Sequence, residues 1–244
     1  MTDKITTIFF DLGYTLINFR GNVYRVLRTS YFSLANSLIK SGCHIDARKF
    51  TRQYQQIISR YYEEREVDQV EQHASVFVNR ALVGVGHPPA SAEILEAAIA
   101  AMFEVTESHW HLENDTHSTL DALKQKGYRL CIISNASNTE DLNRLVDNAN
   151  IRRYFDHIIV SAEERIRKPD RRIYEKALAV MNSTAAESLM VGDTLTADIL
   201  GAQKAGIRAV WITRRARRPD NSRVKKLIKP DFKITKLSEL PKLL

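Results

Sequence analysis

Three apolar runs in the sequence each end in polar side chains that could do chemistry together. The carboxyl ends of parallel strands meet at one edge of a sheet, so groups from distant parts of the chain can converge there. A carboxylate at such an edge is a candidate nucleophile, because attack through a covalent intermediate divides a difficult displacement into two easier steps. The side chains are Asp11 after residues 5–10, Ser134 and Asn135 after residues 129–133, and Asp193 after residues 188–192.

The elements that must position these groups alternate between strand and helix from residue 116 onward. This alternation predicts an α/β fold, with a Rossmann-like, doubly wound parallel sheet, right-handed crossovers and helices on both faces. The predicted strands are residues 5–10, 128–133, 157–160, 188–191 and 209–212, and the predicted helices are residues 116–126, 139–149, 171–181 and 196–204.

Almost a hundred residues after Leu16 have helical rather than strand periodicity. They predict an inserted four-helix domain over residues 17–113, so that residues 1–16 and 114–244 form the α/β core. The insertion follows the first strand, at the edge where the polar groups gather. The four helices are expected at about residues 23–41, 46–65, 68–83 and 91–103, and the apolar face of the first is Val23, Val26, Leu27, Ser30, Leu34, Leu38 and Ile39.

Length and composition indicate a globular protein: 244 residues, 44% of them hydrophobic, are enough for a sizeable core. The sequence contains no apolar stretch of about 20 residues that could span a bilayer and no signal-peptide pattern, so we expect a cytoplasmic protein with no membrane partner. Cys43 and Cys131 lack metal-site spacing, and Cys131 lies in a predicted strand. A disulfide framework is therefore not expected.

The net charge of +7 comes from one segment, residues 214–229. A solvated surface explains this segment better than a nucleic-acid site, because no aromatic residues are interleaved with the basic ones. For the whole protein, we expect a monomer or a homodimer. The segment holds Arg214, Arg215, Arg217, Arg218, Arg223, Lys225, Lys226 and Lys229 against a single acid, Asp220.

Four short motifs, taken in order, resemble those of the haloacid dehalogenase-like (HAD) hydrolases. Each motif alone is weak, but four in order with the expected strand contexts are specific. The helical insertion resembles the C1 type of cap in this family. The motifs are residues 11–16 (DLGYTL), Ser134 with Asn135, residues 168–170 (KPD), and residues 192–193 (GD) with Asp198.

The resemblance implies an Mg²⁺-dependent phosphomonoester hydrolase that acts on a small phosphorylated substrate through an aspartyl-phosphate intermediate. Asp11 is then the nucleophile, and Lys168 and Ser134 stabilise the transferring phosphoryl group. The implied Mg²⁺ ligands are Asp11, the Gly13 carbonyl and Asp193, with Asp198 beside them holding a metal-bound water or Lys168. The implied substrate-binding residues are Thr15, Ser134, Asn135, Lys168 and, at the cavity mouth, Arg20.

Gly13 departs from the family pattern, because family phosphatases usually carry there a second Asp that acts as general acid and base. Such groups contribute about 10²- to 10⁴-fold in rate. A phosphatase with a substitute acid or with good leaving groups is our first interpretation. The alternatives are a catalytically weak protein that binds a phosphorylated ligand or a protein partner, and a 2-haloacid dehalogenase, whose halide leaves without a proton. The candidate substitutes are Tyr14, His44, His73, His87, His109 and His111.

Overall fold

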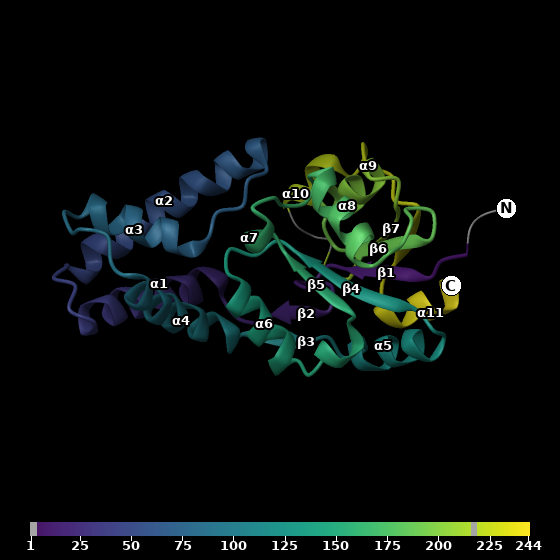
Figure 1. The fold of residues 1–244 in the computed structure, drawn as a ribbon, viewed down its shortest axis with the longest axis horizontal. Helices are drawn as coiled ribbons and strands as arrows, with labels where there is room; N and C mark the ends of the chain where they lie inside the picture. Colours follow the sequence, from purple (N-terminus) through teal and green to yellow (C-terminus); the bar gives the residue numbers. More distant parts are fainter. Residues whose placement is uncertain (1–3, 216–218) are drawn as a thin grey trace.

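A six-stranded, wholly parallel sheet forms the centre of the molecule (Figure 1). The computed structural model describes residues 4–215 and 219–244. The strand order is β5-β4-β1-β6-β7-β8, and the strands are β1 (Thr7–Phe10), β4 (Arg129–Ser134), β5 (His157–Val160), β6 (Ser188–Gly192), β7 (Arg208–Ile212) and β8 (Phe232–Ile234).

The sheet divides the core into two apolar clusters, because successive side chains of a strand point to opposite faces. In β1, Ile8 and Phe10 join one cluster and Phe9 joins the other. Helices α5 (Thr116–Gln125), α6 (Thr139–Asn148) and α11 (Leu240–Leu243), with η3 (Leu237–Glu239), cover the first face; α8 (Arg171–Val180), the π-helical η2 (Leu195–Leu200) and α9 (Gly201–Lys204) cover the second. The predicted α/β architecture is confirmed.

The winding of the sheet reverses beside β1. The chain runs from β1 to β4 and β5 on one side and then returns to the other side as β6, β7 and β8. Open α/β sheets bind ligands outside the carboxyl ends of the strands at such a reversal. Three further short helical segments, η1 (Arg152–Tyr154), α7 (Ser161–Glu164) and α10 (Pro219–Val224), complete the core.

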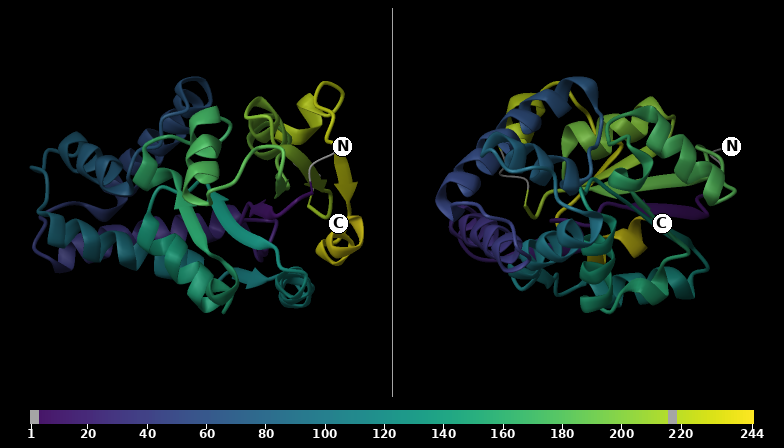
Figure 2. Two further views of the ribbon diagram at one scale, coloured as in Figure 1. Left: turned by 45° about the vertical axis from the view of Figure 1, so that its right-hand side comes forward. Right: turned by 60° about the vertical axis from the view of Figure 1, so that its left-hand side comes forward.

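Four helices between β1 and β4 share an apolar cluster of their own, which lies entirely within residues 31–103. They are α1 (Val23–Lys40), α2 (Ala47–Asp68), α3 (Ala74–Gly84) and α4 (Ala92–Glu107). The side chains of Asn22, Asp46 and Ser91 cap α1, α2 and α4 at their N-termini. In Figure 1 and the left view of Figure 2, these helices lie at the opposite end of the molecule from both termini.

Two details of the predicted helices are wrong. Helix α2 continues to Asp68 and ends at Gln69 in the left-handed conformation, so α3 begins at Ala74 and not at Asp68. The face of α1 is also narrower than predicted: Val23 and Ile39 are each 40% exposed, while Ala35 is fully buried. Helix α1 buries only a narrow stripe against α4 and α2.

A two-stranded antiparallel sheet joins the helices to the core, and the sequence analysis did not predict it. Strand β2 (Ile17–Phe19) pairs with β3 (Trp110–Leu112), so the residues after Leu16 begin as a strand rather than a helix. Asn18 adds a hydrogen bond from its Nδ2 to the carbonyl of His111, at 3.2 Å. Both chain passages between core and helices therefore run through this sheet.

The basic segment 214–229 begins with two arginines in ion pairs. Arg214 contacts Glu113 at 2.9 Å and Asp115 at 2.7 Å, and Arg215 contacts Glu113 at 2.9 Å. The side chains of Arg223, Lys225, Lys226 and Lys229 are exposed. Arg217 and Arg218, and the side chain of Asp220, lie outside the described residues.

Cys43 and Cys131 are both buried and free, as predicted. Among the described residues, no helix is long and apolar enough to cross a membrane.

Candidate active site

The Lys168 ammonium joins two carboxylates at the carboxyl edge of the sheet. Its Nζ lies 2.8 Å from Asp11 Oδ1 and 2.7 Å from Asp198 Oδ1. Lys168 is 2% exposed, and Asp198 is 1% exposed. Burial lowers the pKa of Lys168, but the two carboxylates outweigh this effect and hold its pKa above the ordinary value. The lysine is therefore a fixed positive charge in the site.

The loop after β1 orients Asp11. Its backbone N–H donates to the Val191 carbonyl at 2.9 Å, which ties the end of β1 to β6. The Thr15 hydroxyl donates to Asp11 Oδ2 at 3.2 Å, while Oδ1 accepts from Lys168. The turn that returns Thr15 to Asp11 closes with the Leu16 N–H donating to the Leu12 carbonyl. Both carboxylate oxygens of Asp11 thus have a defined direction.

Asn135 positions Lys168 through the backbone. Its side-chain amide donates to the Lys168 carbonyl at 2.9 Å, and its side-chain oxygen accepts from the Lys168 N–H at 2.8 Å. This reciprocal pair joins the end of β4 to the segment before α8. The amide of Asn135 is therefore engaged with the protein rather than directed at a ligand.

The turn after β6 brings Asp198 back toward β1. The Thr194 N–H donates to Asp198 Oδ2 at 2.8 Å, so both oxygens of Asp198 are partnered. A side chain at Gly192 could not be accommodated, because a Cβ there would lie 2.3 Å from the Asp198 carboxyl carbon. Asp198 lies in the π-helical η2, and π-helical turns occur frequently at functional sites.

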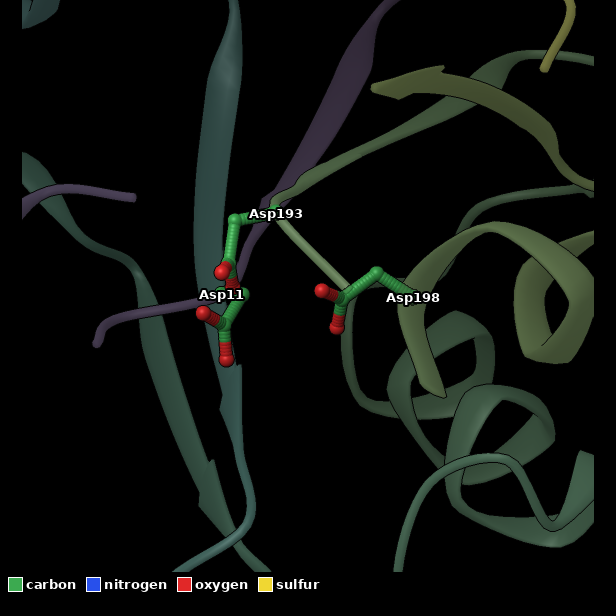
Figure 3. A group of neighbouring side chains, drawn as sticks. All are labelled: Asp11, Asp193 and Asp198. Atoms are coloured by element: carbon green, nitrogen blue, oxygen red, sulfur yellow. The ribbon is translucent and has the colours of Figure 1, made fainter. Parts of the chain in front are cut away.

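Asp11, Asp193 and Asp198 form a buried acidic cluster in which one ligand atom from each lies within 4.8 Å of the others (Figure 3). Burial and repulsion from Asp11 and Asp193 raise the pKa of Asp198, although Lys168 opposes this. One ammonium does not balance three carboxylates, and oxygen ligands at this spacing suit a hard divalent cation. The residues present therefore fit Mg²⁺.

A cavity of about 490 Å³ opens above this cluster. Its core wall carries the polar groups Asp11, Ser134, Asn135, Lys168, Asp193 and Asp198. Its opposite wall is mainly apolar and comes from the β2–β3 sheet and from α1, α2 and α4. The residues are Phe19, Val23, Leu27, Phe103 and Trp110, with Tyr62 and Arg65 of α2.

The cavity includes most of the residues that the sequence singled out. Gly13 and Ser134 line it, and Ser134 is 6% exposed. Thr15 reaches the site through its hydrogen bond to Asp11. Arg20 departs from the prediction: it is exposed and does not belong to the described lining, because its backbone N–H and carbonyl both pair with His109.

Sequence analysis missed several residues that line the cavity, among them Arg65, Trp110, Asp141 and Arg167. Arg65 stacks over the Tyr62 ring at 4.0 Å. Arg167 had a detectable signal, because it directly precedes Lys168 in the third motif. The others lie in no motif, and their positions depend on how the helices pack against the core.

Comparison with known proteins assigns the chain to one family. The sequence profile of haloacid dehalogenase-like hydrolases matches residues 5–206. Glyceraldehyde 3-phosphate phosphatase from Pyrococcus abyssi is 26% identical over 85% of this chain and 81% of its own length. Phosphoserine phosphatase from Thermus thermophilus is 29% identical over 64% of this chain and 58% of its own length.

Two solved structures have similar folds. A HAD phosphatase from Thermococcus onnurineus, 22% identical, superposes with a TM-score of 0.65 over 98% of this chain and 97% of its own. A 2-haloacid dehalogenase from Pseudomonas syringae, 25% identical, gives a TM-score of 0.69 over the same shares. With the profile match over most of its length, the chain belongs to the haloacid dehalogenase-like hydrolases.

Proposed function

We propose that this hydrolase is a phosphatase that transfers the phosphoryl group of a small phosphorylated metabolite to Asp11 and then to water. The observation that carries the proposal is the buried Asp11–Lys168–Asp198 chain beside Asp193, at the end of a cavity large enough for a small metabolite. The phosphatase relatives support the same reaction class.

Asp11 attacks phosphorus with one carboxylate oxygen. The hydrogen bond from Thr15 and the ion pair with Lys168 fix the carboxylate plane before substrate arrives, which lowers the entropy cost of reaching the reactive geometry. Lys168 also offsets the negative charge that attacker and phosphoryl group bring together. Asp198 holds Lys168 from the other side, and Ser134 donates its hydroxyl to a phosphoryl oxygen.

Asp11, Asp193 and the Gly13 carbonyl would hold Mg²⁺, with Asp198 beside them. When bound, the ion supplies the positive charge that draws an anionic phosphoryl group to a cluster of carboxylates. Asp198 already has both oxygens partnered by Lys168 and Thr194, so its contribution is to hold the lysine and the outer shell of the ion.

Residues 17–113 act in this proposal as a cap that supplies the apolar wall and selects the substrate. Their separate apolar cluster and the position of Phe103 and Trp110 in the cavity lining support that role. The wall matches the carbon skeleton of a metabolite rather than its phosphate.

The test is phosphate release from para-nitrophenyl phosphate with and without Mg²⁺, with Asp11→Asn as the matched blank. We expect Mg²⁺-dependent release that the variant abolishes. Release that survives in Asp11→Asn would contradict the proposed nucleophile.

Metal binding is tested without activity, by the melting temperature. A ligand that binds only the folded state raises stability with its concentration, so Mg²⁺ should raise the Tm of the wild type. The same titration should leave Asp193→Asn almost unchanged. Equal shifts in both proteins would place the ion elsewhere.

Dehalogenation is a second candidate, favoured by the similarity to the Pseudomonas syringae enzyme and by Gly13, because a halide needs no proton to leave. The acidic cluster argues against it, because it fits a divalent cation, and displacement of a halide by a carboxylate needs no such ion. Chloride release from 2-chloropropionate without phosphate release from any ester would favour this candidate.

A further inference from the structure

The indole ring of Trp110 lies where a side chain at position 13 would begin. A Cβ built on Gly13 would lie 3.3 Å from Trp110 Cη2 and 3.7 Å from Cζ3. The first distance is tighter than an ordinary carbon contact, and a carboxyl group extends beyond its Cβ. An Asp at this position would therefore have to displace Trp110 or be turned aside by it.

The β2–β3 sheet fixes Trp110 in this place. Trp110 is the register partner of Phe19, and their rings meet edge to face with centroids 5.3 Å apart. The Tyr14 ring packs against the same indole, also at 5.3 Å. A backbone bridge between Gly13 and Ile17 ties the loop to β2. Indole and loop thus belong to one packed unit, and the indole would have to move by a few tenths of an ångström to admit a Cβ at position 13.

None of the described residues that line the cavity is a histidine. Two of the predicted substitute acids are held elsewhere: His73 hydrogen-bonds to Ser75 and Asn138, and His109 stacks on the Phe19 ring. The remaining histidine candidates, His44, His87 and His111, also lie outside the lining. Tyr14 does line the cavity, with its ring packed against Trp110.

Asp141 does line the cavity, and burial and the neighbouring carboxyl of Glu107 raise its pKa to about 8. Glu107 lies on α4 and pairs with Arg144 of α6 at 2.7 Å. Asp141 therefore lies at the contact between α4 and α6, whereas Asp11 follows β1.

We propose that Trp110 is a specificity-determining residue that excludes a proton donor at position 13 and restricts this enzyme to phosphorylated substrates whose leaving group departs as a stable anion. Aryl phosphates and acyl phosphates share this chemistry. The inference rests on the proposed phosphatase function and names the substrate class for the same site.

The two steps balance without an acid at position 13. Asp11 forms a bond to phosphorus, the bond from phosphorus to the leaving oxygen breaks, and its electron pair remains on that oxygen as a phenolate or carboxylate. Water then adds to phosphorus and the bond to Asp11 breaks. The electron pair returns to the carboxylate, and the phosphate leaves with the oxygen and both protons of the water, as H2PO4⁻.

The experiment compares kcat/KM across para-substituted phenyl phosphates of decreasing phenol acidity, acetyl phosphate and ethyl phosphate. For the wild type we expect a steep fall as the phenol becomes less acidic, and ethyl phosphate at least about 10²-fold below para-nitrophenyl phosphate, the range that a general acid supplies. Comparison of acetyl phosphate with the phenyl series shows whether the enzyme prefers acyl phosphates or aryl phosphates.

Three variants separate the indole from the missing acid. Gly13→Asp alone should leave the dependence steep, whereas Gly13→Asp with Trp110→Phe should flatten it, because phenylalanine lacks the ring atoms nearest position 13. Trp110→Phe alone tests packing, and its Tm shows whether the fold is intact. His111→Ala is the matched control, because His111 is the exposed neighbour of Trp110 in β3.

A flat dependence in the wild type, or one that Gly13→Asp alone flattens, would overturn the role of Trp110. So would a steep dependence in the folded double variant. No turnover of any phosphate by the wild type would instead refute the proposed function, so the two failures are distinguishable.

Discussion

The two walls of the cavity are built by different means. The core wall consists of polar and charged groups at the ends of parallel strands and in the segments that follow them, with backbone or side-chain partners between 2.7 and 3.2 Å away. The opposite wall consists mainly of apolar and aromatic side chains held by packing, as in the contact of Trp110 with Phe19, and Arg65 is its charged exception. Charge placement in this molecule is thus set by backbone geometry, and cavity shape by side-chain packing across the β2–β3 sheet.

The largest effect should follow loss of the one lysine that joins the carboxylates. Lys168→Met leaves Asp11 and Asp198 buried without the ammonium between them, and removing one partner of a buried ion pair costs about 3–5 kcal/mol. We expect a Tm well below that of the wild type and a fall in kcat of about 10²- to 10³-fold. Thermal unfolding and steady-state kinetics on para-nitrophenyl phosphate measure both.

The matched control is Lys176→Met, on the surface of the same half of the molecule, where Lys176 pairs with Glu164. It should change neither quantity appreciably, because exposed ion pairs contribute little. Equal losses of Tm and kcat in Lys168→Met and Lys176→Met would mean that neither stability nor activity depends on the buried ion pairs of Lys168.

A smaller effect should follow a change where the helices meet the core away from the β2–β3 sheet. Glu71 is 3% exposed, accepts from Tyr61 at 2.6 Å and Ser161 at 2.9 Å, and pairs with Arg167 at 3.3 Å. Glu71→Ala removes these acceptors, and we expect about 1–3 kcal/mol less free energy of unfolding. Urea unfolding measures the loss.

The control is Glu63→Ala, which removes an exposed glutamate of α2 and so makes the same change of residue type without breaking buried contacts. If the two variants unfold at the same urea concentration, the Glu71 contacts add nothing to the attachment of the helices.

The smallest effect is a pH dependence at the contact between α4 and α6. The pKa of Asp141 is about 8 in the folded protein against an ordinary 3.8, with Glu107 facing it from α4 and Arg144 beside it on α6. Between these values the folded state binds more protons than the unfolded state. The associated stability is therefore present at low pH and lost as pH rises through about 8.

Asp141→Asn stays neutral, so the variant should lose less stability than the wild type as the pH rises from about 5 to about 8. Denaturant midpoints at the two pH values measure the difference. Parallel pH profiles for the two proteins would contradict the raised pKa of Asp141.

The sequence predicted three groups of the core wall because each follows a recognisable apolar run, and Lys168 and Asp198 were expected from the motifs that resemble the family. Asp11, Ser134 and Asp193 end strands whose buried residues are contiguous, and parallel strands align these ends without further information. The opposite wall was not predictable in the same way. Strands β2 and β3 have three residues each, too few for a periodic pattern, and Asn18 meets His111 across 93 residues.

Strand β8 was missed for a related reason. Phe232–Ile234 is three residues with a lysine at its centre, and only its pairing with β7 makes it a strand. Asp141 and Glu71 likewise acquire their environments from helices that are distant in sequence. Local patterns therefore specified the longer elements and the polar edge of the sheet, whereas the three-residue strands and the contacts between the helices and the core required the three-dimensional structure.

The β2–β3 sheet has a topological consequence. The Arg20 N–H donates to the His109 carbonyl at 2.8 Å, although 89 residues separate them, so the helical unit leaves and re-enters the chain at adjacent points. Strands β2 and β3 are thus the arms of an ordinary β-hairpin whose turn has been expanded into four helices. Because the ends of the insertion already touch, a short turn from residue 20 to residue 109 would preserve the hairpin and the parallel sheet beneath it. The loop-closure entropy of the long connection grows only logarithmically with its length.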